Sequence, residues 1–510
     1  MAREDAPEHF DVVVVGAGIS GIGAGYYLQR DCPQKSYVIL EGRENIGGTW
    51  DLFRYPGIRS DSDMFTLGYT FKPWTAQKAI ADGPSILQYL EETADQYDIR
   101  DKIRFKHHVK GAEWSSEDAR WLVEAERDGE TVWISCNFLF MCTGYYNYEA
   151  GYTPDWQDFD RYQGKIVHPQ HWPQDLDYAG KQVVVIGSGA TAVTLVPAMI
   201  DSEGPPEHVT MLQRSPTYMV SRPSEDAVAN FLRKWLPSQF AYNLIRWRNA
   251  LLQHIVFRRA RNKPEKVKAF LLDKVQDELG PDYDISTHFT PSYNPWEQRL
   301  CLVPDSDFFR VIRNGKASVE TGHIDRFTER GVRLQSGEEM EADIVVTATG
   351  LDLQMAGGAE ITVDGQPVNF GDKVTYKAMM FDDVPNLAFS FGYTNASWTL
   401  RADLTCEYVA RLLNYMDANG VQIAVPRLPE DEQIERLPWV DFSSGYFKRA
   451  EDKLPAQGDR GVWRNLQNYR KDVKELREAP IADEAMVFAE TGTITFGPTT
   501  SKEPEAIAAE

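Results

Sequence analysis

Two short glycine-rich segments have the residue types and the spacing to hold a phosphate group. Residues 11–15 (DVVVV) run directly into residues 16–21 (GAGISG), and residues 182–186 (QVVVI) run into residues 187–192 (GSGATA). In this pattern a buried strand ends in a tight turn, and the next helix presents unpaired N–H groups to a phosphate. The cofactor-binding positions predicted here are Gly16, Gly18, Ser20 and Gly21, then Gly187, Ser188, Gly189, Ala190, Thr191 and Ala192.

A polar residue downstream of each turn indicates which adenosine it binds. The strand pattern at 36–40 ends at Glu41, whose carboxylate can accept hydrogen bonds from ribose hydroxyls. The strand pattern at 208–212 is followed by Arg214 and Ser215, which can instead bind a 2′-phosphate. The alternative for Arg214 is a solvated charge at a strand end. The first site is therefore predicted to prefer an unphosphorylated adenosine, and the second NADP.

Two more apolar strands end in small residues, 138–144 (FLFMCTG) and 343–350 (DIVVTATG). Such endings suit the edge of a nucleotide-binding sheet, where backbone must come close to a cofactor or a neighbouring segment. Together with the two turns they predict a flavoprotein with two dinucleotide sites, one for a fixed flavin and one for a diffusible NADPH.

The composition excludes several classes of protein and of site. Acidic residues outnumber basic ones by 76 to 54, and the net charge of −22 argues against a protein that coats nucleic acid or anionic membrane. The five cysteines of the 510-residue chain are scattered without a C-x-x-C pair, which excludes dithiol reductases and the common zinc motifs. No metal site is predicted. No segment reaches 18 consecutive apolar residues, so a cytoplasmic protein is expected.

Two further motifs carry a resemblance. Residues 47–61 read GGTWDLFRYPGIRSD, and the segment from Tyr162 to Pro173 places Gly164, His168 and Trp172 at characteristic intervals. With 293–301 (YNPWEQRLC) and 392–399 (GYTNASWT), they resemble the type I Baeyer–Villiger flavin monooxygenases, in the subgroup of the ethionamide-activating monooxygenase. The resemblance runs from about residue 10 to 490, and Tyr162 stands where the family usually has Phe.

The resemblance implies a fold, cofactors and roles. The expected fold is α/β, with two Rossmann-like dinucleotide-binding domains that hold FAD and NADPH. The expected reaction, through a C4a-peroxyflavin, converts ketones to esters or lactones with O2, and oxidises thioethers as a side activity. The family's catalytic arginine matches Arg299, and the carboxylate that partners it matches Asp61. Without the motifs, Arg299 would be interpreted as a surface ion and Asp61 as a loop cap. Gln298 replaces a lysine that some members have. In the family the motif around His168 lies between the two nucleotide domains and couples their motion, so His168 is expected to have a structural or conformational role rather than that of a general base. Further cofactor positions are Gly48, Thr49, Trp50, Arg59, Ser60, Asp61 and Val109.

Other functions stay open at this point. One is an N- or S-oxygenating flavin monooxygenase, which shares the turns but does not need Arg299. A second is a flavin reductase that passes electrons to a partner protein, and the least favoured is a nucleotide-binding module without activity. The sequence does not indicate which ketone is the substrate, nor the oligomeric state.

The motif order divides the chain into domains. Residues 1–148 and 351–510 are predicted to form the FAD domain, and residues 149–350 the NADPH domain, with a helical insert at about 222–294. Within the insert, residues 233–268 hold ten Lys or Arg and one acid, a net charge of +9. The favoured interpretation is a solvated helical face whose Leu, Ile and Trp side chains pack inward. The alternative is a basic amphipathic surface that touches anionic membrane.

Overall fold

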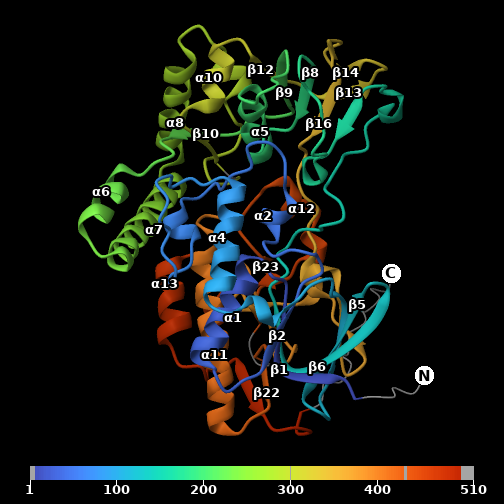
Figure 1. The fold of residues 1–510 in the computed structure, drawn as a ribbon, viewed down its shortest axis with the longest axis vertical. Helices are drawn as coiled ribbons and strands as arrows, with labels where there is room; N and C mark the ends of the chain where they lie inside the picture. The colour runs from blue at the N-terminus through green and yellow to red at the C-terminus, as the bar shows by residue number, and fades with distance from the viewer. Residues whose placement is uncertain (1–5, 299, 430–432, 495–510) are drawn as a thin grey trace, which may run out of the picture.

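Each glycine-rich turn follows a buried strand that has neighbours on both sides in its own sheet. The computed structural model describes residues 6–298, 300–429 and 433–494. The first sheet has the order β18-β17-β4-β5-β6-β1-β2-β3 with β21 beside β6, and the second has the order β12-β9-β8-β16-β7. Figure 1 shows the first sheet in the lower half of the molecule and the second at the top. Their strands are β1 (Glu8–Val15), β2 (Tyr37–Leu40), β3 (Ile103–Arg104), β4 (His108–Ser115), β5 (Arg120–Arg127), β6 (Glu130–Met141), β17 (Glu360–Val363), β18 (Gln366–Pro367), β21 (Leu387–Phe389), β7 (Lys165–Val167), β8 (Gln182–Ile186), β9 (His208–Gln213), β12 (Ala317–Thr321) and β16 (Ile344–Thr347).

The β-branched strands lie at the centre of each core. In the first sheet Val12 pairs with Tyr37 of β2 on one side and with Phe138 of β6 on the other, both in parallel. In the second sheet β8 lies between β9 and β16, also in parallel. A parallel sheet is covered by helices on its faces, which explains why both predicted strands are continuous apolar runs. The α/β fold with two Rossmann-like sheets is confirmed, as are all six predicted strands.

Helices on the two sheets extend the cores. In the first, α1 (Ile19–Asp31) packs beside α11 (Trp398–Asn419), with Tyr27 donating a hydrogen bond to Glu407 at 3.3 Å. α4 (Gly83–Gln96) joins the same core through Ile86 and Leu90. In the second, α5 (Ala190–Ile200) packs against α10 (Asp307–Arg313). The return of the chain to the first core through α11 brings the C-terminal third beside the first turn.

The predicted insert is helical, and it contacts both cores. It contains α6 (Ala227–Trp235), α7 (Ser238–Asn262), α8 (Pro264–Leu279) and α9 (Ile285–His288). It leaves and rejoins the second half of the molecule at the parallel pair β10 (Met219–Arg222) and β11 (Cys301–Pro304). Ala241 and Ile245 of α7 belong to the first core, whereas Val275 of α8 belongs to the second. In Figure 1 α6 and α7 project from the left side of the molecule.

The membership of the strands in the two sheets bears on the predicted domain division. The domain division at 1–148, 149–350 and 351–510 stays a prediction, which the membership of the strands in the two sheets supports. No helix in the described ranges is long and apolar enough to cross a membrane. The remaining elements outside the 3₁₀ turns are α2 (Thr49–Leu52), α3 (Met64–Leu67), α12 (Gly445–Arg449), α13 (Tyr469–Val473), β13 (Ile324–Phe327), β14 (Gly331–Leu334), β15 (Glu339–Glu341), β19 (Thr375–Tyr376), β20 (Met380–Phe381), β22 (Ile423–Pro426), β23 (Leu437–Pro438), β24 (Ala456–Gln457), β25 (Met486–Ala489) and a π-turn at Lys474–Glu478.

Candidate active site

Both glycine-rich turns open into one cavity of about 1080 Å³. Of the predicted site residues, Gly21 and Ala192 lie beneath the turns rather than on the cavity wall, and Arg299 lies outside the described residues. Gln298 and Cys301, which flank position 299 in the sequence, line the cavity. The predicted residues on the wall are Gly16, Gly18, Ser20, Glu41, Gly48, Thr49, Trp50, Arg59, Ser60, Asp61, Val109, Gly187, Ser188, Gly189, Ala190, Thr191, Arg214 and Ser215.

The first turn depends on glycine for close packing. Gly16 has a φ of +102°, and a Cβ there would lie 2.7 Å from the Cys142 carbonyl oxygen. A Cβ on Gly21 would lie 1.8 Å from the Gly16 carbonyl oxygen, so only glycine lets α1 approach β1. The close contact between the turn and the backbone at Cys142 explains why small residues follow β6.

The second turn repeats this arrangement on the second sheet. Gly187 has a φ of +136°, and a Cβ there would lie 2.2 Å from the carbonyl oxygen of Ala348, which follows β16. A Cβ on Gly189 would instead meet nothing within 4 Å. The space beyond Gly189 is therefore the cavity.

The helices after both turns start without a side-chain cap. Gly18 is the N-cap of α1 and Gly189 that of α5, and neither helix has an acid in its first turn. Their first N–H groups and the positive ends of their dipoles are available to an anion in the cavity. Arg59 adds a buried donor on the wall: one guanidinium nitrogen pairs with Asp307, and Nη2 has no partner among the described residues. These donors fit two dinucleotides with their pyrophosphates on the turns.

The two turns differ in the group that follows the next strand. Glu41 is buried, and its carboxylate accepts hydrogen bonds from the N–H of Ala17 at 2.7 Å and of Arg43 at 2.9 Å. Burial raises the pKa of Glu41 above its usual value, while these two hydrogen bonds oppose the rise. Arg214, after β9, is exposed and has no ion pair within the described part of the chain. An acceptor thus follows β2 in the first sheet, and a cation follows β9 in the second.

The segment from Gly47 to Asp61 connects the two halves of the cavity. A Cβ on Gly57 would lie 2.4 Å from the Cβ of Ala198, so this segment packs closely on α5. Tyr55 is buried beside α5, and burial raises its pKa, with a hydrogen bond to Thr191 lowering it and the charge of Asp61 raising it. Tyr55 therefore reaches the second turn, at Thr191, from a segment that begins at the first turn.

Much of the remaining wall comes from residues that the sequence did not assign. Trp398, at the start of α11, donates a hydrogen bond from Nε1 to Ser20 Oγ at 2.9 Å and stacks on Tyr145 at 5.4 Å between ring centroids. Arg449, on α12, lies over the ring of Tyr152 at 3.5 Å. Burial lowers the pKa of Arg449, and the charge of Arg214 contributes to the lowering, so these two cations are neighbours on the wall. No local pattern marks Arg449, since it lies more than 200 residues from the turn.

The motif from Tyr162 to Pro173 packs away from the cavity wall. The Tyr162 hydroxyl donates to the Ala342 carbonyl at 2.8 Å, and a Cβ on Gly164 would lie 2.2 Å from that hydroxyl oxygen. His168 caps a 3₁₀ turn by accepting from the N–H of Gln170, and burial lowers its pKa. Its ring would collide with a Cβ on Gly151. This packing supports a structural role for His168.

The described residues include all five cysteines, which are buried, and none of them forms a disulfide. No group of three His, Cys, Asp or Glu side chains in the described ranges could hold a metal ion.

Comparison with known proteins agrees with this geometry. The family model described as "Pyridine nucleotide-disulphide oxidoreductase" matches residues 13–236. "FAD-containing monooxygenase EthA" of Mycobacterium tuberculosis (strain ATCC 25618 / H37Rv) is 54% identical over 94% of this chain and 98% of its own. "Probable FAD-binding monooxygenase AlmA" of Acinetobacter baylyi is 50% identical, over 94% of this chain and 96% of its own.

Solved structures have the same fold. "Oxidized steroid monooxygenase bound to NADP" superposes with a TM-score of 0.75 at 24% identity, over 94% of this chain and 100% of that chain. An "Epsilon-caprolactone-bound" cyclohexanone monooxygenase gives 0.73 at 22% identity, over 94% and 100%. From its identity to EthA along nearly the whole length, the chain belongs to the FAD-containing monooxygenases, in the type I Baeyer–Villiger group that its motifs indicate.

Proposed function

We propose that this enzyme uses NADPH and O2 to insert one oxygen atom beside the carbonyl group of a ketone, giving an ester or a lactone. The second oxygen atom leaves as water, and NADPH supplies the two electrons that this requires. The observation that carries the proposal is that both turns, with unlike adenosine ends, line one cavity. Groups held at the two turns can therefore meet. Bound FAD supplies the activated oxygen.

We assign FAD to the first turn and NADPH to the second. In the first, the N-terminus of α1 would bind the pyrophosphate, and Glu41 would accept hydrogen bonds from the ribose. In the second, Arg214 and Ser215 would hold the 2′-phosphate, with Arg449 as a further cation beside them. The steroid monooxygenase of the same fold is described as bound to NADP, which supports a nicotinamide cofactor beside the flavin.

We further propose that Asp61 and Arg299 act on the reacting atoms. A fixed cation would stabilise the negative charge that develops on the carbonyl oxygen as the new carbon–oxygen bond forms. The family's motif gives this role to Arg299 and makes Asp61 the carboxylate that orients it. Asp61 and the sequence neighbours Gln298 and Cys301 line the same cavity, which supports the pairing.

The test is NADPH consumption with product analysis across linear, cyclic and aryl ketones and thioethers. We expect ester or lactone from at least one ketone class, sulfoxide from thioethers, and loss of ester formation in Arg299→Ala. Arg222→Ala, an exposed arginine away from the cavity, is the matched control. Near wild-type ester formation in Arg299→Ala would overturn the role of Arg299.

The same panel distinguishes the other functions. Products from thioethers and amines alone would identify an N- or S-oxygenating enzyme. NADPH oxidation without any oxygenated product would identify a reductase that passes electrons to a partner.

A further inference from the structure

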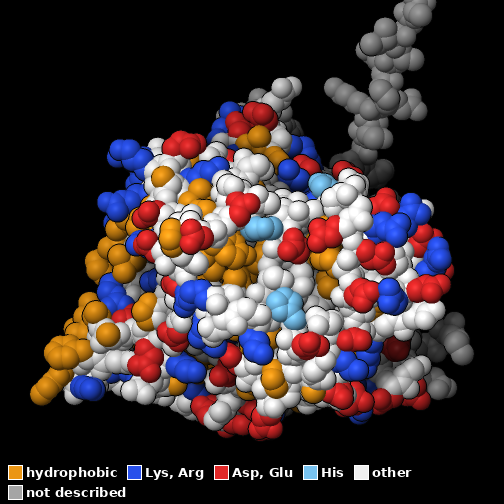
Figure 2. All heavy atoms as spheres, turned by 90° about the horizontal axis from the view of Figure 1, so that it is seen from above, with side chains coloured by type: hydrophobic (Ala, Val, Ile, Leu, Met, Phe, Trp, Pro, Cys, Tyr) orange, Lys and Arg blue, Asp and Glu red, His pale blue; other side chains and the backbone are white. Residues whose placement is uncertain are grey.

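The insert carries nearly all of the exposed large apolar side chains. Of the eleven such side chains in the described part of the chain, ten lie on α6, α7 and α8. Trp235 is 76% exposed, Trp247 64% and Phe231 63%. Figure 2 shows hydrophobic side chains gathered along the left edge, where α6 and α7 project in Figure 1, with Lys and Arg side chains among them. We call the exposed faces of these three helices the insert surface.

The α7 helix is apolar on two opposite faces. Tyr242, Ile245 and Ala241 are buried against the first core, while Phe240, Leu244 and Trp247 are exposed. The exposed positions follow a spacing of four and three residues, which places them on one side of the helix. The sequence favoured Trp residues that pack inward. That expectation is wrong for Trp235 and Trp247, which face outward.

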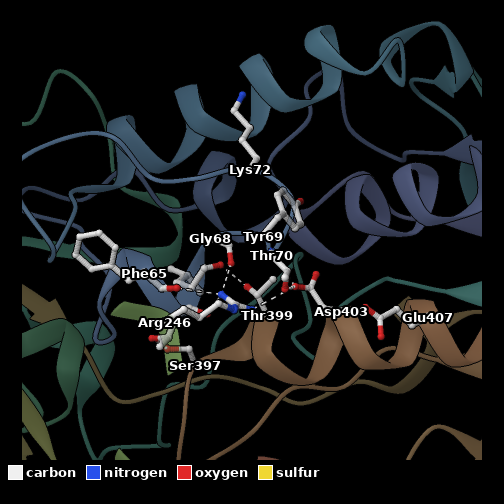
Figure 3. A network of polar contacts seen from close by, with 12 residues as sticks. Phe65, Gly68, Tyr69, Thr70, Lys72, Arg246, Ser397, Thr399, Asp403 and Glu407 are labelled. Atoms are coloured by element: carbon white, nitrogen blue, oxygen red, sulfur yellow. Dashed lines mark hydrogen bonds and ion pairs between the residues drawn. The ribbon is translucent and has the colours of Figure 1, made fainter. Parts of the chain in front are cut away.

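The buried face of α7 is fixed to the rest of the molecule. Arg246 is fully buried, pairs with Asp403 of α11 at 3.2 Å, and donates to the carbonyl oxygens of Phe65, Thr66 and Gly68 at 2.6 to 3.1 Å. Figure 3 shows this network between α7 and α11. The outward position of Phe240 and Trp247 is therefore set by a rigid support on the opposite face.

The ten cations of residues 233–268 divide into three sets. Arg233 donates to the carbonyl oxygens of Thr75 and Ala76, and Lys268 donates to that of Pro291. Arg246, Arg248 and Arg261 form ion pairs, with Asp403, Asp226 and Asp441 respectively. Five others, which are all exposed, form no ion pair within the described residues: Lys234, Arg258, Arg259, Lys263 and Lys266. Unpaired positive charge is thus interleaved with exposed aromatic side chains in a chain whose net charge is −22.

We propose that the insert surface docks on an anionic lipid bilayer. Helices with Trp, Phe and Leu on an apolar face and Lys and Arg on the polar face beside it lie in the membrane interface, with the apolar side chains below the headgroups. Tryptophan is enriched at that depth, and anionic headgroups attract the five unpaired cations. A two-fold contact between two copies would instead bring this surface, with its five unpaired cations, against the same surface of the second copy. The charge of the surface therefore favours lipid over a second copy.

The experiment is co-sedimentation of the FAD-loaded full-length protein with two kinds of vesicle. We expect binding to vesicles of equal parts phosphatidylglycerol and phosphatidylcholine, and little binding to phosphatidylcholine alone. Raising the salt from about 0.1 M to about 1 M shortens the screening length from about 10 Å to about 3 Å and should release the protein. Absence of binding to the anionic vesicles at low salt would overturn the proposal.

Two matched variants compare the cations of the insert surface with lysines elsewhere on the protein. K234Q/R258Q/R259Q/K263Q/K266Q removes the five unpaired cations, and K102Q/K165Q/K181Q/K316Q/K471Q removes five exposed lysines elsewhere. We expect the first variant to bind at least about tenfold more weakly and the second to bind as wild type. Equal loss in both would overturn the role of this surface.

A second pair of variants tests the contribution of the exposed apolar side chains to lipid binding. Trp235→Ser should weaken binding, whereas Leu466→Ser, at an exposed apolar residue outside the insert, should not. The absorbance of bound FAD and the melting temperature check that each variant is folded. Light scattering without lipid tests whether a second copy of the chain covers the surface. If the protein is a dimer that persists in the five-cation variant but is disrupted by Trp235→Ser, the surface belongs to a second copy. That result would overturn the lipid proposal.

Discussion

Arg214 follows a strand whose counterpart in the first sheet is followed by Glu41, and this exchange of charge determines what each site can accept. A carboxylate accepts hydrogen bonds from ribose hydroxyls, while a guanidinium can hold a phosphate through two hydrogen bonds. Arg449 strengthens the positive end, although it belongs to a distant part of the sequence.

We expect Arg214→Gln to lower the preference for NADPH over NADH by about 10- to 100-fold in kcat/KM, the loss of one charge-assisted interaction. Arg222→Gln removes an exposed arginine at the end of another strand and should leave the ratio unchanged. An unchanged ratio in Arg214→Gln would show that the 2′-phosphate is recognised elsewhere.

Two glycines of the turns should separate folding from binding. Gly21→Ala forces a Cβ to 1.8 Å from backbone, so we expect a loss of about 3 kcal/mol in the free energy of unfolding. Gly189→Ala places its Cβ in open space and should change that free energy by less than about 0.5 kcal/mol. It should nevertheless weaken NADP⁺ binding, because the added methyl group points where the phosphate approaches. Denaturant melts and NADP⁺ titrations measure the two effects, and equal stability of the two variants would contradict the packing argument.

At the scale of elements, the sequence predicted the strands and turns because their signals are local. A continuous β-branched run followed by glycines is compatible with few structures, and the residues that press on the turns were predicted from their own small side chains. Which face of α7 is buried could not be predicted in this way. Both of its faces are apolar, so its periodicity does not say which face is buried, and the answer depends on Arg246 reaching a carboxylate on α11.

That ion pair yields a prediction about how the insert is held. Arg246→Met removes the cation paired with the buried Asp403, whose carboxylate keeps, among the described residues, only its hydrogen bonds from Thr70, and three carbonyl groups lose the Arg246 donor. We expect a loss of about 3–5 kcal/mol in the free energy of unfolding. Arg248→Met, on the same helix, breaks a partly exposed pair with Asp226 and should cost about 1 kcal/mol or less. Denaturant melts of the FAD-loaded proteins compare them, and similar losses would mean that the buried pair does not anchor α7.

At the scale of the whole molecule, two sheets that each hold a turn share one cavity, and each site can be tested by its ligand. Removal of FAD should lower the melting temperature, because a ligand present at about 1,000 times its Kd stabilises the folded state by about 4 kcal/mol. NADP⁺ should raise the melting temperature of the FAD-free protein more than NAD⁺ does, since the second turn does not depend on the first for its backbone. Equal shifts with NADP⁺ and NAD⁺ would contradict recognition of the 2′-phosphate, and no shift with either in the FAD-free protein would contradict the independence of the two sites.

The composition of the cavity wall could not be predicted, because its members come together only through the fold. Trp398, Tyr145 and Arg449 belong to segments with no shared pattern, and their meeting depends on the return of the chain through α11 to the first core. The position of Arg299 in the site rests on the family motif, since this residue lies outside the described ranges.

Because the turns and the aromatic wall are supplied by separate segments, substrate scope is open to engineering at little cost to cofactor affinity. The backbone around Gly16 and Gly187 tolerates almost no change, whereas Tyr146, Gln354 and Tyr446 present side chains to the cavity from outside the glycine-rich turns. A combinatorial library restricted to these three positions would alter the size of the substrate that fits while both cofactors stay in place.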